Sequence, residues 1–314
     1  MSAPISRFRL IARRSLGWVL AVAITVVGAL MVWRWAAKPE GKLVQVREFG
    51  ENPTGLEMHL YVPPRRLPNP PVILALHWCQ GSGPIFYANT RYAQLADKQG
   101  YIVIYPSVTR ASQCWDVHSP ASLIRDGASD PRGLLSMLRY VVEHHDADSQ
   151  RLFVTGFSSG GMMTQVLLGT YPDIFKAGAA FAGVPFGCFA GPSEWQEACA
   201  LGKLTKTPQE WAELVQRAYP TFTGRRPAVQ LWHGTEDDSL HFNNFGESIK
   251  QWTYVLGTSE TPVSTVRGVP DRRWTRMNYA VVDGETRLEA FRGQGVPHNF
   301  NIPAEEVIRF FGLD

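Results

Sequence analysis

A serine flanked by glycines is the part of this sequence whose residue types and spacing could do chemistry. The run Gly156-Phe157-Ser158-Ser159-Gly160 has the pattern G-x-S-x-G, with a short apolar run before it and a helix-forming run after it. A strand that turns into a helix within so few residues strains its central residue and exposes that side chain at the tip of the turn. A plain glycine-rich turn is the alternative. The flanking strand and helix favour Ser158 as a nucleophile.

A serine hydroxyl needs a base to take its proton, and that base needs a carboxylate to hold its orientation. The chain order serine, acid, histidine is the order that α/β-hydrolases use. His298, in a Gly-Gln-Gly loop near the C-terminus, is the candidate base. Asp237, after a later strand, is the candidate acid. Its neighbours Glu236 and Asp238 compete with it, and spacing alone does not separate the three.

Attack on an ester creates an oxyanion, which needs backbone N–H donors aimed at it. Ser159 can supply one donor, because it follows the candidate nucleophile directly. The second donor normally lies in the loop after an earlier strand, and Cys79 falls in such a loop, His77-Trp78-Cys79-Gln80-Gly81. We therefore expect Ser159 and Cys79 to form the oxyanion hole.

These loops need a scaffold that brings strand ends together. Apolar runs alternating with helical segments predict an α/β fold, a mostly parallel sheet with helices on both faces and functional loops at the carboxyl ends of the strands. The expected strands are 43–49, 56–62, 72–76, 101–105, 152–155, 177–184, 229–232, 274–282 and 287–292. The expected helices are 91–98, 130–145, 160–168, 208–218, 242–255 and 304–311, with Asp130 as the N-cap of the second.

Composition divides the 314-residue chain into two parts. Residues 1–42 carry seven Lys or Arg and one Glu, so of the chain's 31 basic and 28 acidic residues the remainder holds 24 and 27. The net charge of +3 therefore comes from the N-terminal segment, and the rest of the chain offers no basic surface for nucleic acid. We expect a catalytic domain over residues 43–314, preceded by a basic tail, an anchor and a linker over 1–42.

The N-terminal segment has the pattern of a transmembrane helix, about residues 15–35. Its uncharged run follows four arginines, and eighteen helical residues would span about 27 Å, close to the hydrocarbon thickness of a bilayer. Trp18 and Trp33 lie near its ends, and the excess of arginine before it predicts a cytoplasmic N-terminus with the catalytic domain periplasmic or extracellular. Cleavage near Gly28, as in a signal peptide, is the alternative and would make the protein secreted.

The chain has four cysteines, an even number that predicts two disulfide bonds outside the cytoplasm. They are Cys79, Cys114, Cys188 and Cys199, and sequence alone allows three pairings. Cys188 with Cys199 would close a short loop, and Cys79 with Cys114 would then tie two loops together. Their spacing matches neither a C-x-x-C pair nor a zinc site, so we expect structural bridges and no metal.

From about Val44 to its end, the chain resembles carbohydrate esterase family 1. The resemblance is to its fungal acetylxylan esterases in particular, and more loosely to feruloyl esterases and polyhydroxybutyrate depolymerase-like esterases. It rests on the long stretches NPTGLEMHLYVP, ALHWCQGSG, YIVIYPS, CWDV, VTGFSSGGMMTQVLLGTYPDIFKAG, GVPFGCF, WHGTEDDSL and the final GVPH.

This resemblance implies an α/β-hydrolase fold with Ser158 as nucleophile, His298 as base and Asp237 as acid. The family motif HGTxD selects this acid, because it places the carboxylate four residues after the histidine, here His233. The resemblance also implies Trp115 as an aromatic that lines the substrate pocket; a core tryptophan is the alternative. No cofactor or metal is implied.

By the same resemblance, Cys79 pairs with Cys114 and Cys188 with Cys199. The expected function is a membrane-anchored serine esterase that removes acetyl groups from xylan or xylo-oligosaccharides through an acyl-enzyme. A feruloyl esterase and a hydroxybutyrate-oligomer depolymerase would use the same triad, and the shape of the acyl pocket separates them. A non-catalytic carbohydrate-binding protein on the same scaffold is a further alternative, against which the intact serine, aspartate and histidine argue.

Overall fold

The computed structural model describes residues 39–314, and the expected transmembrane segment 15–35 lies outside the described residues. Within residues 39–314, no helix is both long enough and apolar enough to cross a bilayer. From Glu40 to Asp314 the chain folds into one unit.

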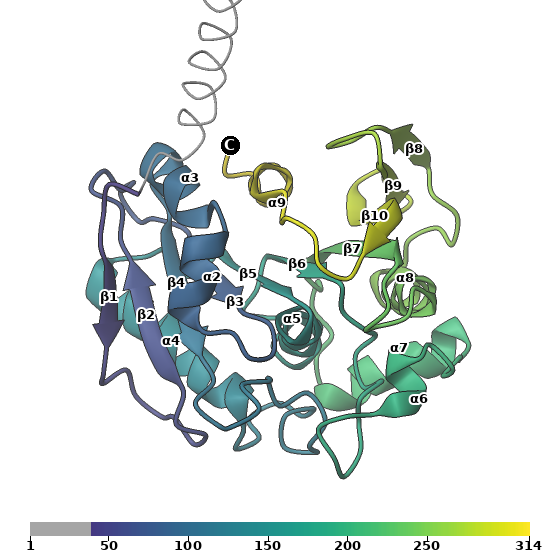
Figure 1. Ribbon diagram of the computed structural model, residues 1–314, viewed down its shortest axis with the longest axis horizontal. Helices are drawn as coiled ribbons and strands as arrows, with labels where there is room; N and C mark the ends of the chain where they lie inside the picture. The colour runs from purple at the N-terminus through teal and green to yellow at the C-terminus, as the bar shows by residue number, and fades with distance from the viewer. Residues whose placement is uncertain (1–38) are drawn as a thin grey trace, which may run out of the picture. The chain divides into compact units, whose positions relative to one another are not determined.

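A single sheet of ten strands organises the described residues, in the order β1-β2-β4-β3-β5-β6-β7-β10-β9-β8 (Figure 1). Six neighbouring strands of this sheet run parallel to one another: β4, β3, β5, β6, β7 and β10. Antiparallel pairs extend the sheet at each edge. The strands are β1 (Leu43–Val46), β2 (Glu57–Tyr61), β3 (Val72–Leu76), β4 (Ile102–Ser107), β5 (Leu152–Phe157), β6 (Ala177–Phe181), β7 (Ala228–Glu236), β8 (Ser264–Arg267), β9 (Trp274–Ala280) and β10 (Thr286–Pro297). The expected mostly parallel sheet is confirmed.

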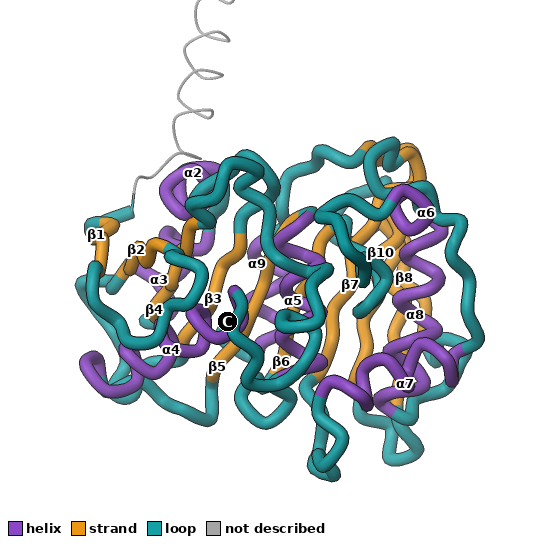
Figure 2. The backbone as a smooth tube through the Cα atoms, turned by 90° about the horizontal axis from the view of Figure 1, so that it is seen from below, coloured by secondary structure: helices purple, strands orange, loops and turns teal. Residues whose placement is uncertain are grey.

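Helices cover both faces of this sheet, as predicted. The apolar residues of α4, α5, α7 and α8 pack in one core cluster, and those of α2, α3 and α9 pack in a second cluster on the other face (Figure 1). Seen from below, the strands run side by side between these helices (Figure 2). The helices are α2 (Gly83–Asn89), α3 (Tyr92–Gln99), α4 (Asp130–His145), α5 (Ser159–Thr170), α6 (Glu197–Ala200), α7 (Pro208–Ala218), α8 (Asn243–Leu256) and α9 (Ala304–Phe311).

The central strands form where the sequence has unbroken apolar runs. All five residues of β3 and all six of β5 are buried, because helices cover both of their faces. One helix start differs from the prediction. Ser129, with extended backbone, is the N-cap of α4, and Asp130 is its first helical residue. The Asp130 carboxylate is buried and forms an ion pair with Arg110, so it is not free to cap the helix.

The parallel strands bring their carboxyl ends to one edge of the sheet. β3 ends at Leu76, β5 at Phe157, β7 at Glu236 and β10 at Pro297. The residues that follow these ends include every candidate for the triad and the loop that contains Cys79.

Candidate active site

Ser158 lies in a strained turn between β5 and α5. Its backbone has φ 56° and ψ −119°, a conformation that residues other than glycine rarely adopt. The Ser158 N–H donates to the carbonyl of Phe181 on the neighbouring strand at 2.8 Å, which helps to hold this conformation. The sharp turn predicted from G-x-S-x-G is therefore present.

The two glycines of the motif allow the strand and the helix to approach closely. A Cβ added to Gly156 would lie 2.3 Å from the Gly160 carbonyl oxygen, and a Cβ added to Gly160 would lie 2.3 Å from the Leu76 carbonyl oxygen. Both contacts are to backbone atoms, which cannot move away as a flexible side chain can. A larger residue at either position would push the turn out of place.

A hydrogen-bonded chain links the three candidate triad residues. The Ser158 Oγ lies 3.0 Å from His298 Nε2, and His298 Nδ1 lies 2.7 Å from Asp237 Oδ2. With Nδ1 protonated and donating to the carboxylate, Nε2 of a neutral His298 is free to accept the proton of Ser158. Residues 140 positions apart in the sequence thus come within one hydrogen bond of each other.

Burial separates Asp237 from the neighbouring acids. Its side chain is fully buried, whereas Glu236 and Asp238 are exposed. The second carboxylate oxygen of Asp237 accepts hydrogen bonds from the N–H groups of Leu240 at 2.7 Å and Ser239 at 3.0 Å. These bonds fix the carboxylate plane so that the other oxygen faces His298.

His233 is a second histidine on the same carboxylate. Its Nε2 lies 3.1 Å from Asp237 Oδ2 and 2.8 Å from the Leu240 carbonyl oxygen, so its N–H is shared between two acceptors. Burial acts to raise the pKa of the Asp237 carboxyl, but the hydrogen bonds from His233 and His298 outweigh it and hold that pKa below its usual range. Asp237 is therefore ionised at neutral pH.

In the sequence, His233 only locates the acid, and its contact with Asp237 is not predicted. The spacing of four residues between His233 and Asp237 was the available signal, because both lie at the carboxyl end of β7. That spacing by itself does not tell which way the two side chains turn.

The candidate oxyanion donors belong to two different elements, α5 and the loop after β3. Ser159 is the first residue of α5, and N–H groups in the first turn of a helix have no acceptor within the helix. Cys79 follows β3 and is joined to Cys114 by a disulfide bond. Both residues border the same cavity as Ser158.

Trp115 ties the Cys114 loop to the nucleophile turn. Its backbone N–H donates to Ser159 Oγ at 2.8 Å, and its indole Nε1–H donates to the His77 carbonyl at 2.8 Å. Its side chain is buried and also borders the cavity. Trp115 is thus both a core residue and a residue of the pocket wall, and its binding of substrate stays a prediction.

His77 follows β3, but both of its ring nitrogens bond to backbone groups and neither bonds to a triad residue. It is fully buried, and its Nε2 accepts a hydrogen bond from the Val108 N–H at 3.1 Å, so Nδ1 carries the proton and donates to the Trp78 carbonyl at 2.6 Å. Burial lowers the pKa of His77 to about 4, so the ring is neutral near pH 7. This neutral ring supports the loop that contains Cys79.

A cavity of about 370 Å³ opens over Ser158 and His298. Its remaining wall is largely apolar and aromatic, formed by Trp78, Trp115, Phe157, Met162, Phe189 and Trp195. Within residues 39–314, no group of three His, Cys, Asp or Glu side chains is arranged to hold a metal ion. The polar groups of this cavity suit acyl transfer through a serine.

Both disulfide bonds that the resemblance implied are present. Cys79 is bonded to Cys114, and Cys188 is bonded to Cys199, with no free cysteine in the described chain. The first bridge borders the active-site cavity. The second bridge is buried in the segment between β6 and α7.

The chain is similar to known esterases. Residues 56–194 match the family described as Esterase PHB depolymerase. The chain is 44% identical to feruloyl esterase B of Thermothelomyces thermophilus, over 86% of this chain and 93% of that protein. It is 40% identical to a probable acetylxylan esterase A of Aspergillus flavus, over 87% of this chain and 89% of that protein.

The fold has a close match among solved structures. An acetyl xylan esterase from Aspergillus awamori superposes with a TM-score of 0.83 and 35% identity, over 87% of this chain and all of that chain. An S-formylglutathione hydrolase from Staphylococcus aureus, with a TM-score of 0.55 and 12% identity, shares the fold alone. Identity of this extent over nearly the whole described chain shows that the protein belongs to the family of the acetylxylan esterases and feruloyl esterases, which are serine carboxylic-ester hydrolases.

Proposed function

We propose that Ser158, His298 and Asp237 are the catalytic triad of an esterase that removes acetyl groups from xylan or xylo-oligosaccharides. The observation that carries this proposal is the continuous chain of hydrogen bonds from Ser158 Oγ through His298 to a buried carboxylate, at 3.0 and 2.7 Å. The acetylxylan esterases among its relatives support the substrate.

The geometry supports a two-step mechanism. Ser158 Oγ attacks the ester carbonyl carbon while His298 Nε2 takes the hydroxyl proton, and Asp237 stabilises the imidazolium that forms. The N–H groups of Ser159 and Cys79 stabilise the oxyanion, each worth about 10²- to 10³-fold in rate. Collapse of the intermediate breaks the bond to the sugar oxygen, which takes the proton from His298 and leaves as a hydroxyl, with the acetyl group on Ser158.

A water molecule completes the cycle. His298 takes a proton from this water as its oxygen attacks the acetyl-enzyme carbonyl, and the second intermediate collapses to release acetate. The returned proton restores the Ser158 hydroxyl. Trp115 and the other aromatic residues of the cavity wall would hold the sugar or the acyl group against this site.

A feruloyl esterase is the second candidate, because the chain is 44% identical to a feruloyl esterase B. Depolymerisation of hydroxybutyrate oligomers remains a third candidate, on the description of the matching family. The same triad serves all three, so the difference lies in the acyl and alcohol groups that the cavity admits. The intact triad geometry argues against a non-catalytic carbohydrate-binding protein.

Parallel assays on acetylated xylo-oligosaccharides, methyl ferulate and hydroxybutyrate oligomers test the substrate. We expect acetate release to have the highest kcat/KM. Preferential release of ferulate or hydroxybutyrate would overturn the acetyl assignment and leave the triad untouched. Ser158→Ala is the inactive control, and Ser149→Ala, at an exposed serine, is the matched active control.

We further propose an N-terminal anchor in residues 1–42 that holds a catalytic domain of residues 43–314 outside the cytoplasm. Two disulfide bonds support an oxidising compartment, since such bonds persist mainly outside the cytoplasm. Cleavage of the N-terminal segment would instead release the enzyme as a secreted protein. Fractionation of cells, with N-terminal sequencing of the mature enzyme, distinguishes the two.

A further inference from the structure

A second cavity, of about 670 Å³, lies at the amino ends of the central strands. Its lining includes residues at the starts of β6, β7 and β10, among them Lys176, Ala228 and Thr286. The triad lies at the opposite ends of these strands. The nine residues of β7 alone separate the two places by about 25 Å, at about 3.3 Å per residue. This cavity is therefore distinct from the active site.

The acidic side chains of this cavity already have cationic partners. Asp173 accepts from Arg125 at 2.8 Å, and Glu289 accepts from Arg309 at 2.6 Å. Glu285 forms an ion pair with Arg225. These carboxylates therefore leave little negative charge for the other cations of the cavity.

Arg226 is one cation of this cavity that these acids leave without a partner. Its guanidinium makes no hydrogen bond or ion pair to any residue in 39–314, and its Nη1 is buried with no acceptor. Burial, with no opposing carboxylate, lowers the pKa of Arg226. Buried donors without an acceptor are rare in folded proteins and cost free energy, so a missing acceptor is the direct explanation.

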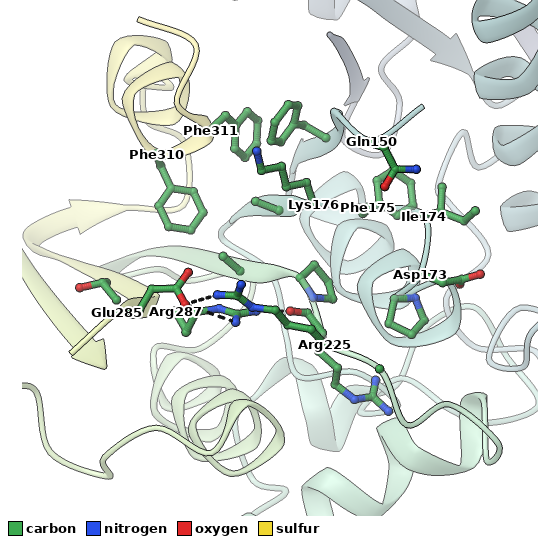
Figure 3. Close-up of a pocket in the computed structure, with 18 of the residues that line it drawn as sticks. Gln150, Asp173, Ile174, Phe175, Lys176, Arg225, Glu285, Arg287, Phe310 and Phe311 are labelled. Atoms are coloured by element: carbon green, nitrogen blue, oxygen red, sulfur yellow. Dashed lines mark hydrogen bonds and ion pairs between the residues drawn. The ribbon is translucent and has the colours of Figure 1, made fainter. Parts of the chain in front are cut away.

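Two further cations face the same space. Arg287 is largely buried, donates to the Arg226 carbonyl and reaches Glu285 only at 3.8 Å. The Lys176 ammonium has no acceptor within the described residues, and Figure 3 shows Lys176 across the hollow from Arg225 and Arg287. Positive charge thus lies on both sides of the cavity.

Apolar rings complete the lining. Arg226 lies over the ring of Phe222, 5.4 Å from its centre. Phe310 of α9 lies across the hollow from the arginines (Figure 3). A ligand that accepted hydrogen bonds from these cations would therefore also contact aromatic and aliphatic side chains.

We propose that this cavity is a binding site for an organic anion, with a carboxylate or phosphate group bound by Arg226 and Arg287 and an apolar body against Phe222 and Phe310. Guanidinium groups bind both anions through paired, charge-assisted hydrogen bonds. The cavity volume falls within the range of small-molecule sites. The proposal is independent of the esterase reaction, because no triad residue contributes to it.

Calorimetric titration of the full-length protein in a neutral detergent tests the site. The probes are benzoate and phenyl phosphate, with benzamide as the uncharged analogue of benzoate. We expect saturable binding of at least one anion, at least tenfold tighter than benzamide, and the preferred anion identifies the head group. Arg226→Gln should weaken binding about tenfold or more, the cost of a lost charge-assisted bond.

Arg217→Gln, at an exposed arginine on α7, is the matched control and should bind the anions normally. Hydrolysis of p-nitrophenyl acetate by Arg226→Gln should equal that of the unaltered protein, which verifies its fold. If Arg226→Gln does not fold, Arg287→Gln, at the second arginine assigned to the anion, replaces it with the same expected weakening. Absence of saturable binding by both anions, or equal affinity in the cavity variants, would overturn the proposal.

Discussion

Replacing His77 by glutamine isolates the contribution of one buried histidine beneath the loop that contains Cys79. Glutamine can still accept from the Val108 N–H, one of the two bonds that His77 makes, but it does not titrate. The variant therefore keeps this hydrogen bond and removes the proton-binding site.

The expected magnitude follows from the pKa of His77. Burial lowers this pKa from 6.5 to about 4 in the folded protein. Between these values the unfolded chain binds the proton and the folded protein does not, so stability is complete above pH 6.5 and falls as the pH falls toward 4. At about 1.4 kcal/mol per pKa unit, the full loss is about 3 kcal/mol, and about 2 kcal/mol of it has occurred by pH 4.5.

Urea unfolding at pH 7 and pH 4.5 measures this loss. The unaltered protein should lose about 2 kcal/mol more free energy of unfolding between the two pH values than His77→Gln does. His144→Gln, at an exposed histidine, is the matched control and should show the pH dependence of the unaltered protein. An equal loss in His77→Gln and the unaltered protein would refute the assignment of a neutral, buried His77.

The remaining predictions concern the triad and its turn. Asp237→Asn should lower kcat about 10⁴-fold with little change in KM, since the amide favours the wrong tautomer of His298; a drop under tenfold in steady-state assays would contradict this role. His233→Phe should lower kcat about tenfold, because Asp237 loses a charge-assisted hydrogen bond. An unchanged kcat would exclude a contribution of His233 to the reaction. Gly160→Ala should prevent soluble expression, because the added Cβ would collide with the Leu76 carbonyl oxygen. Gly246→Ala in α8, where an added Cβ meets nothing within 4 Å, should raise the melting temperature, because alanine favours a helix more than glycine does.

The local parts of the site could be predicted because their signals are local. The turn at Ser158 is encoded by glycines on both sides, and the long apolar runs of β3 and β5 mark central strands. Chain order then limited the choice of base and acid. Helices such as α7 and α9 have clear caps or amphipathic faces and match their expected bounds.

Features that depend on distant contacts could not be predicted. Without the family motif, the choice of Asp237 over Glu236 and Asp238 depends on burial under the loop at Leu240, which spacing alone does not reveal. The contact of His233 with the acid, and the unpaired charge of Arg226, depend on side-chain directions in the same way.

Three short elements were not predicted, and two of them lack a sequence signal for a physical reason. All four residues of β8 are exposed at the sheet edge, so the strand has no apolar alternation. The helix α6 has only four residues, too few for a period to appear. In contrast, α2 has a start signal in Ser82 as N-cap and Pro84 in its first turn, so this helix was predictable from the sequence.

The most direct test of the account is the site of covalent labelling by a fluorophosphonate probe, mapped by mass spectrometry. The account predicts one adduct, on Ser158, which is lost in Ser158→Ala together with ester hydrolysis while the variant stays folded. Ser159→Ala, the adjacent serine, keeps its backbone N–H and should still be labelled at Ser158. An adduct on another residue, or full hydrolytic activity in Ser158→Ala, would contradict the central claim.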